Sequence, residues 1–559
     1  MVIPKTLLVA ALLLLSALAS GGCGGAAADG NAKILAVGTN GAIDSLNPFV
    51  LTEPEAFVLA SLVYPQLISY GGKDGATIVP AWASSWKASP DGRTWTFHLR
   101  PGKWSDGKPM TADDAVWTIE TELKYRRGPT ALPAGALVGV TGASAPDPRT
   151  LVVTYRRPVG NALSQLSQIY FLPQHVWAPV AGADGKGLKA YRVEQHLPLV
   201  GGGPFTVTRF DPKGTTVLKR NPGYFGKPPA MAALSFTYYT NSVAMLAAFK
   251  QGDISLIDQV PFDAVSAAKA LPDTTVTSAS GATVVTLLLN SNPEKPRNRE
   301  LLDPRVREAL ELATDRSALV GVPFRGAAQP WANWISAYSG DWADPSLKPS
   351  ALDLDQANAI LDSLGYTKGK DGIRVVPATG GPFAQAAHRM SYGFAVPGDL
   401  QFNGERAEQQ IARTWRQAGV AIHTVPTGDT SASYTYYQGP YRNGQATYAH
   451  SDVGIWYYVG YADPTYTLDI ATEAQWGNYN DTGYANPAYD SLFQRQARTV
   501  DQARRRAIVW QMEALLAHDR PYIPLVDLTS TMATRTSWTG ANPNLYGYPT
   551  FIDGLHPAG

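Results

Sequence analysis

The stretch PAWASSWKASPDGRTWTFHLRPGKWSDGKPMTADDAV, residues 80–116, decides the fold because its turns and apolar positions follow one another in a definite order. Asp91-Gly92 is a turn dipeptide. After it the apolar Trp95, Phe97 and Leu99 alternate with polar residues, which predicts a strand with one buried face.

The second half of the same stretch predicts a turn followed by a helix. Asp106-Gly107 is again a turn dipeptide. Thr111 stands at an N-cap position with Asp114 three residues later, so a helix is predicted to begin at Ala112.

Further segments follow in a fixed order along the chain. Residues 34–37 predict a first strand, and residues 242–249 predict a helix. The motifs around them are DSLNP at 44–48, GGPFTV at 202–207, RNPGYF at 220–225 and KQGDI at 250–254.

Together these segments resemble the extracytoplasmic solute-binding proteins, family 5, of ABC importers, which carry peptides, nickel chelates and some oligosaccharides. The resemblance covers essentially residues 33–530. It implies an α/β, two-lobed periplasmic-binding-protein-like fold (type II, large peptide-binding subclass) with an extra subdomain in lobe 1 and a two-segment hinge.

The resemblance also implies a division of the chain. We expect a lipoprotein signal peptide and lipobox at 1–23, a flexible tether at 24–32, and lobe 1 at 33–285 with an inserted subdomain at about 56–195. Lobe 2 is expected at 286–522, and a C-terminal return to lobe 1 at 523–559.

The N-terminus independently predicts export. Lys5 precedes an apolar run at 7–19, small residues and Cys23, the order of a secretory signal. Cys23 is the only cysteine, which excludes an internal disulfide. Its place after the apolar run predicts lipidation and anchoring to the outer face of the cell membrane. Ser20 departs from the usual aliphatic residue of a lipobox, so cleavage near Ala19 with an incidental cysteine is the alternative.

Composition excludes several classes of protein. With 559 residues, 45% of them hydrophobic, the chain can bury more than one core. A formal net charge of +1 argues against a nucleic-acid partner, because phosphate binding needs surplus Lys and Arg. No apolar run after the signal approaches the roughly 18 residues of a membrane span.

The second half of the chain predicts alternating strands and helices. Residues 283–289 form an apolar run typical of a strand buried on both faces. Helices are predicted after Asp303 and Asp353, and before Gly419, which leads into a strand at 420–425. A last helix at 501–518 is expected to bury one face made of Ala507, Trp510, Ala514 and Leu515.

Catalytic motifs are scarce, so we expect no enzyme. Ser84-Ser85-Trp86-Lys87 satisfies S-x-x-K, but no K-T-G or S-D-N accompanies it. None of the eight histidines lies three or four residues from another, which argues against a zinc site. We therefore expect no catalytic residue, metal or cofactor.

Aromatic residues are dense between residues 434 and 484, which suits ligand recognition because rigid rings bury area at low entropic cost. About half of them would simply pack a lobe. By the resemblance, the segment GIWYYVGYADP at 454–464 lies along the ligand in peptide-binding members. The expected ligand-binding residues are Thr52, Glu53, Trp456, Tyr457, Tyr458, Gly460, Tyr461, Asp463, Asn480 and Tyr484.

One position departs from the family pattern. Peptide binders place an Asp for the ligand α-ammonium where this chain has Gly460. A buried ammonium without a counter-charge is costly, so free-N-terminus peptides are disfavoured. Asp463 is expected to cap a turn with Pro464, although either it or Glu53 could compensate for the missing charge.

The leading hypothesis is a monomeric, lipid-anchored receptor that closes two lobes around a peptide-like or other small polar solute and delivers it to membrane permease subunits of an ABC importer. An extracytoplasmic sensor or chaperone without transport is the alternative, and an exported hydrolase is a weaker one.

Overall fold

The structure is a computed structural model that describes residues 33–558, except 132, 381–384, 399, 401, 443–444, 546 and 548. Cys23 and the predicted signal segment lie outside the described residues. A mixed sheet of eleven described strands is the largest sheet of the part of the chain that the structure describes. Its order is β10-β11-β12-β1-β13-β24-β14-β23-β19-β20, with β15 paired to β24. The strands are β1 (Ile34–Thr39), β10 (Phe205–Arg209), β11 (Thr215–Arg220), β12 (Ala233–Tyr238), β13 (Leu256–Ile257), β14 (Thr274–Leu289), β15 (Ala328–Pro330), β19 (Ser391–Val396), β20 (Ala421–Pro426), β23 (Val453–Val459) and β24 (Tyr522–Arg535).

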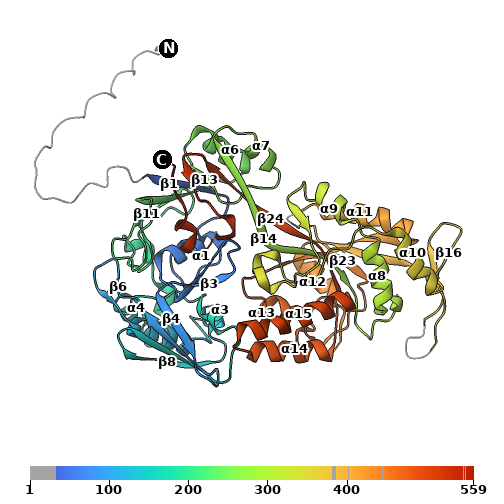
Figure 1. The fold of residues 1–559 in the computed structure, drawn as a ribbon, viewed down its shortest axis with the longest axis horizontal. Helices are drawn as coiled ribbons and strands as arrows, with labels where there is room; N and C mark the ends of the chain where they lie inside the picture. Colours follow the sequence, from blue (N-terminus) through green and yellow to red (C-terminus); the bar gives the residue numbers. More distant parts are fainter. Residues whose placement is uncertain are drawn as a thin grey trace, which may run out of the picture. The chain divides into compact units, whose positions relative to one another are not determined.

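Two long antiparallel strands, β14 and β24, run side by side between the two halves of this sheet (Figure 1). The first half consists of β10-β11-β12-β1-β13, and the second half consists of β23-β19-β20. Residues 533–534 of β24 pair with β13 in the first half. Residues 283–289 of β14 pair with β23 in the second half. The pairing shifts register between Ser280 and Val284, where Ala282 has a φ of 58°. The predicted strand at 283–289 is confirmed as the end of β14, and its last six residues are buried.

The first half carries a separate four-stranded sheet built from the stretch that opened the sequence analysis. Its order is β4-β5-β9-β8. The predicted alternation is confirmed, because Trp95, Phe97 and Leu99 of β5 are all buried. The predicted helix is confirmed as α2, and the Thr111 N–H donates to Asp114 Oδ2 at 3.0 Å. These elements are β4 (Ala83–Ala88), β5 (Thr94–Leu99), β8 (Val140–Asp147), β9 (Thr150–Tyr155) and α2 (Ala112–Lys124).

Helices on the second half of the sheet begin where the sequence predicts. Asp303 accepts a hydrogen bond from the Arg305 N–H at 2.9 Å, and Asp353 accepts one from the Gln356 N–H at 2.8 Å. The helix before Gly419 is also confirmed, and this glycine has a φ of 86°. The three helices are α8 (Pro304–Leu312), α10 (Leu354–Ser363) and α11 (Gly404–Gln417).

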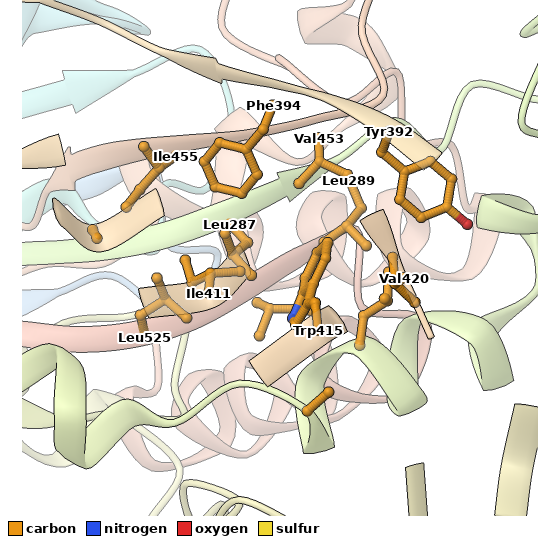
Figure 2. Close-up of a cluster of buried hydrophobic side chains, with 14 of the residues drawn as sticks. Leu287, Leu289, Tyr392, Phe394, Ile411, Trp415, Val420, Val453, Ile455 and Leu525 are labelled. Atoms are coloured by element: carbon orange, nitrogen blue, oxygen red, sulfur yellow. The ribbon is translucent and has the colours of Figure 1, made fainter. Parts of the chain in front are cut away.

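Their apolar faces and the strands enclose one buried core, in which Trp415 of α11 lies among side chains from β14, β19 and β23 (Figure 2). The Trp415 indole N–H donates to Thr314 Oγ1 at 2.9 Å, which satisfies the one polar group of this fully buried ring. A separate aromatic cluster in the same half includes Trp334, Tyr437, Trp456 and Tyr458.

The last long helix, α15 (Gln502–Asp519), is confirmed in position, but the face that we expected to be buried is wrong. Ala507 and Ala514 are exposed, and Trp510 and Leu515 are only half-buried. The buried face is offset from the expected one because it contains two charged residues whose partners lie elsewhere in the chain. Its members are Arg505, Ile508, Val509, Met512, Glu513 and Leu516.

The remaining helices cover the two halves. They are α1 (Pro54–Val63), α3 (Ala162–Leu166), α4 (Gln174–Ala181), α5 (Lys186–Ala190), α6 (Ser242–Gln251), α7 (Val265–Lys269), α9 (Arg316–Gly321), α12 (Thr430–Gln438), α13 (Thr465–Ile470) and α14 (Pro487–Arg498). Four short strand pairs are described: β2 (Ile68–Gly71) with β3 (Thr77–Pro80), β6 (Gly102–Lys103) with β7 (Pro109–Met110), β21 (Tyr441–Arg442) with β22 (Gln445–Ala446), and β25 (Trp538–Thr539) with β26 (His556–Pro557). A small three-stranded sheet has the order β16 (Thr367–Lys368), β17 (Arg374–Val376), β18 (His388–Arg389). Among the described residues, no helix combines the length and apolarity that crossing a membrane requires.

Candidate ligand-binding site

A cavity of about 560 Å³ lies where the segment after β23 faces residues of the first half of the chain. Its volume falls in the range of small-molecule sites. The wall from the second half consists of Tyr461, Ala462 and Asp463. The remaining described lining residues are Pro48, Phe57, Gln66, Tyr70, Pro133, Gly135, Ala136, Ser164, Ser167, Gln168, Tyr170 and Gly547.

Tyr461 offers the cavity an accessible aromatic ring. Its side chain is 49% exposed, and its ring meets the Tyr466 ring edge to face at 5.3 Å. Its backbone is held in place, because its carbonyl accepts a hydrogen bond from Ser339 Oγ at 2.7 Å. The ring is therefore presented from a fixed backbone, as a binding surface requires.

Asp463 lines the same wall, but its carboxylate is already bound. Arg505 of α15 donates to Oδ2 at 2.5 Å and to Oδ1 at 2.8 Å. Thr465 donates to Oδ1 from its N–H at 3.0 Å and from its hydroxyl at 2.6 Å, the turn-capping contact that the sequence predicts. Burial alone would raise the pKa of Asp463, but the Arg505 charge and these hydrogen bonds hold the pKa below its ordinary value.

The wall from the first half is built of hydroxyl, amide and aromatic groups. Gln66 Nε2 donates to the Ser167 carbonyl at 2.5 Å, and the Tyr170 hydroxyl donates to the Phe57 carbonyl at 3.0 Å. Burial and the nearby Asp463 charge raise the pKa of Tyr70 to about 12, so this phenol stays protonated. These groups can exchange neutral hydrogen bonds with a solute.

A side chain at Gly460 would collide with Ser336. The Gly460 N–H donates to the Ala282 carbonyl at 2.5 Å, at the register shift of β14. A Cβ at this position would overlap Ser336 Oγ and would lie 3.0 Å from Ser336 Cβ. The departure from the family pattern at Gly460 therefore has a steric basis.

The aromatic residues of β23 lie within the second half. Trp456 is 9% exposed, stacks on Tyr457 at 6.0 Å and meets Tyr437 edge to face at 5.8 Å. The Tyr458 hydroxyl donates to Asp481 Oδ2 at 2.5 Å. None of these rings is among the described residues that line the cavity.

Asn480 and Tyr484 are likewise engaged inside the second half. Asn480 Nδ2 donates to the carbonyls of Thr472 at 3.0 Å and Tyr484 at 2.9 Å. The Tyr484 hydroxyl donates to Asp519 Oδ2 at 2.6 Å. Both residues are buried, so their contacts hold the loop between α13 and α14.

Thr52 and Glu53 are exposed at the start of α1 and do not appear in the described cavity lining. The Thr52 N–H and hydroxyl both donate to Asp44 Oδ2, at 2.9 and 2.6 Å. Of the ten residues expected to bind ligand, the structure brings only Tyr461 and Asp463 to the cavity.

The lining residues from the first half were missed by the sequence analysis. Gln66, Tyr70, Ser164, Ser167 and Gln168 lie within or beside short elements and belong to no motif. The sequence indicated only that these residues lie within the expected subdomain at 56–195, and not that they line a cavity. No group of three or more potential metal-ligating side chains occurs among the described residues.

Comparison with known proteins identifies the family. The model for bacterial extracellular solute-binding proteins, family 5 (middle region), matches residues 77–479, and the chain belongs to this family. A Brucella ovis protein named "Putative ABC transporter peptide-binding protein" is 28% identical over 333 residues, which are 59% of this chain and 60% of that protein. The Escherichia coli nickel-binding periplasmic protein is 28% identical over 337 residues, which are 59% of this chain and 61% of that protein. These matches thus span about 60% of the length of the curated relatives.

Solved structures show the same fold. HbpA2 from Haemophilus parasuis has a TM-score of 0.77 at 18% identity, covering 94% of this chain and 100% of that one. The Bacillus subtilis oligopeptide-binding protein AppA, in complex with a nonapeptide, has a TM-score of 0.64 at 20% identity, covering 94% and 99%. The expected two-lobed periplasmic-binding-protein-like fold is confirmed.

Proposed function

We propose that this protein captures a peptide-like or other small polar solute between its two lobes and delivers it to the permease subunits of an ABC importer. The observation that supports this function best is the cavity of about 560 Å³ between residues of the two halves, on a family 5 fold. The names of the relatives, a peptide-binding and a nickel-binding protein, point to the same class of activity.

We further propose that lobe 1 comprises residues 33–285, with a subdomain at about 56–195, and the return at 523–559, and that lobe 2 comprises residues 286–522. The pairing of β14 with β24 supports a two-strand hinge, because β24 pairs with β13 in the first half and β14 pairs with β23 in the second. Closing the lobes around a solute would be the population shift that the permease recognises. No nucleophile beside a base occurs among the described lining residues, and the proposal includes no catalysis.

The proposal also places the protein, as a monomer, outside the cytoplasm with a lipid on Cys23, which lies outside the described residues. Two acyl chains bury enough methylene groups for stable attachment, whereas one gives only marginal binding. Cys23→Ala is therefore expected to release the protein from the membrane fraction. Unchanged fractionation of this variant would contradict the anchor while leaving solute binding intact.

The binding function is tested by identifying the solute that co-purifies with the protein by mass spectrometry and measuring its affinity by calorimetry. Tyr461→Ala is expected to weaken binding tenfold or more, because the ring lines the cavity. Tyr441→Ala is the matched control, since Tyr441 is 47% exposed and is not part of the described lining. Equal affinity of the two variants for the solute would contradict this site. Genes for permease and ATPase subunits beside the gene for this protein would distinguish import from sensing.

A further inference from the structure

The charge of the cavity can be read from its lining. Among the described lining residues, Asp463 is the only one whose side chain carries a formal charge at neutral pH. The other polar groups are hydroxyls and amides, from Ser164, Ser167, Gln66 and Gln168, and the phenols of three tyrosines.

Arg505 neutralises this single charge from behind the wall. Its side chain is fully buried, and its two terminal nitrogens hold both oxygens of Asp463. Its Nε donates to Gln496 Oε1 at 3.0 Å, and the guanidinium lies 4.6 Å from the centre of the Trp342 ring. Each arm of the guanidinium therefore has a partner, and the paired Asp463 is not available to a charged solute.

A second position for a counter-charge is closed by packing. Ser336 occupies the space into which a side chain at residue 460 would extend, so an acid there would have to displace the Ser336 side chain. Glu53, the other acid considered from sequence, is exposed and is absent from the described lining. An ammonium or carboxylate enclosed in this cavity would lose its water without gaining an opposite charge, which is unfavourable.

We infer that the part of the solute enclosed in this cavity carries no formal charge, and that Arg505 sets this selectivity by neutralising Asp463. The inference rests on the proposed function and specifies its substrate class. The lining suits an uncharged group with hydrogen-bonding edges and an apolar face, which is the chemistry of both a peptide blocked at its ends and a neutral oligosaccharide.

The test compares three probes by calorimetry: trialanine, whose two ends are charged, N-acetyl-trialanine amide, whose ends are blocked, and cellotriose. At least one uncharged probe is expected to bind tenfold or more tightly than trialanine. Tighter binding of N-acetyl-trialanine amide than of cellotriose identifies a peptide-like solute, and tighter binding of cellotriose identifies a saccharide. Tighter binding of trialanine than of both uncharged probes would overturn the inference but would leave solute binding in place. The absence of binding with all three probes, together with no co-purified solute, would instead contradict the proposed function.

Variants of the ion pair test its role directly. Arg505→Gln leaves the Asp463 carboxylate without its cation, so the preference is expected to move tenfold or more toward trialanine. The double variant Asp463→Asn, Arg505→Gln removes both charges and is expected to return the preference to that of the unaltered protein. Arg506→Gln is the matched control, because Arg506 is the next residue of α15 and pairs with the exposed Asp341 instead.

Both variants are first compared with the unaltered protein by circular dichroism. If Arg505→Gln does not fold, the double variant still decides. Its lining carries no formal charge, so a tenfold preference for trialanine in it would show that the charge of the lining does not set selectivity and would overturn the inference. An unchanged preference in a folded Arg505→Gln would overturn the inference in the same way.

Discussion

At the scale of single residues, the contact between Gly460 and Ser336 shows how one glycine fixes the chemistry of a neighbouring site. The glycine allows β23 to lead directly into the wall of the cavity, with its N–H bound to the bulge of β14. The same lack of space leaves no room for the acid that the resemblance to peptide binders implies at this position. The proposed selectivity against a charged end therefore depends on this packing as well as on the neutralisation of Asp463 by Arg505.

Gly460→Ala is expected to lower the free energy of unfolding by about 1–3 kcal/mol, because the added methyl overlaps Ser336 Oγ. Adding Ser336→Ala should recover most of this loss, since it removes the overlapping atom. Gly321→Ala is the control, because a Cβ at that position meets no atom of the described residues within 4 Å, apart from its chain neighbours and the backbone of its own helix. Urea denaturation measures all of these values, and equal stability of Gly460→Ala and Gly321→Ala would contradict the packing argument.

Glu122 of α2 gives a pH-dependent prediction. Its carboxyl is 3% exposed, and burial raises its pKa from 4.5 to about 8. Between these values the folded state holds a proton that the unfolded state has released, so stability falls as the pH rises. Glu122→Gln should flatten the stability profile between pH 5 and pH 7.5 by about 3 kcal/mol relative to the unaltered protein.

The control for this prediction is Asp113→Asn on the exposed side of the same helix. It should leave the slope of stability against pH unchanged, as measured by urea denaturation at several pH values. A profile of Glu122→Gln parallel to that of the unaltered protein would contradict the raised pKa of Glu122.

At the scale of elements, caps and apolar spacing allowed several helices to be predicted. Asp303, Asp353 and Thr111 each stand at the start of a helix in the structure, because an N-cap is a local interaction that the sequence displays directly. The buried face of α15 could not be predicted from the spacing of its apolar residues. Arg505 and Glu513 lie on it because their partners, Asp463 and the backbone N–H groups of Ile335 and Asp344, are distant in the chain.

Two adjacent leucines of α15 test the observed face. Leu516 is 2% exposed and belongs to the aromatic cluster, whereas Leu515 is only half-buried. Leu516→Ala is expected to lower the free energy of unfolding by about 2–4 kcal/mol, because it removes buried contacts and leaves a cavity. Leu515→Ala should cost about 1 kcal/mol or less. A larger loss of stability in Leu515→Ala than in Leu516→Ala, measured by thermal or urea denaturation, would favour the buried face that was expected from the sequence.

At the scale of the whole molecule, the order of motifs was sufficient to predict the two-lobed fold, but not the composition of the cavity. The turn, strand and capped helix at 80–116 are local, and the structure reproduces them. The lining residues Gln66, Tyr70 and Ser164 come together with Tyr461 only through the tertiary arrangement. Polar residues in short connections carry no periodic or motif signal, so sequence alone could not bring them to one site.

A second contact between the two halves lies at Gly160, away from the hinge strands. The Gly160 N–H donates to the Ala497 carbonyl at 2.8 Å, and Gln502 Nε2 donates to the Gly160 carbonyl at 3.1 Å. A Cβ on Gly160 would lie 2.5 Å from the Gln496 carbonyl oxygen and 3.1 Å from Arg505 Cδ. Only glycine fits this contact, which therefore holds the arrangement of the two halves seen here.

Gly160→Ala is expected to weaken solute binding tenfold or more, about 1.4 kcal/mol, because a methyl group prevents the contact that accompanies closure. The free energy of unfolding should change little, since each lobe keeps its own core. Gly380→Ala is the control, because a Cβ there meets no atom of the described residues within 4 Å, its chain neighbours apart. Calorimetry measures the affinity for the co-purified solute, and small-angle X-ray scattering measures whether the variant still compacts when the solute is added. An unchanged affinity with normal compaction would show that the Gly160 contact is not part of the closing movement.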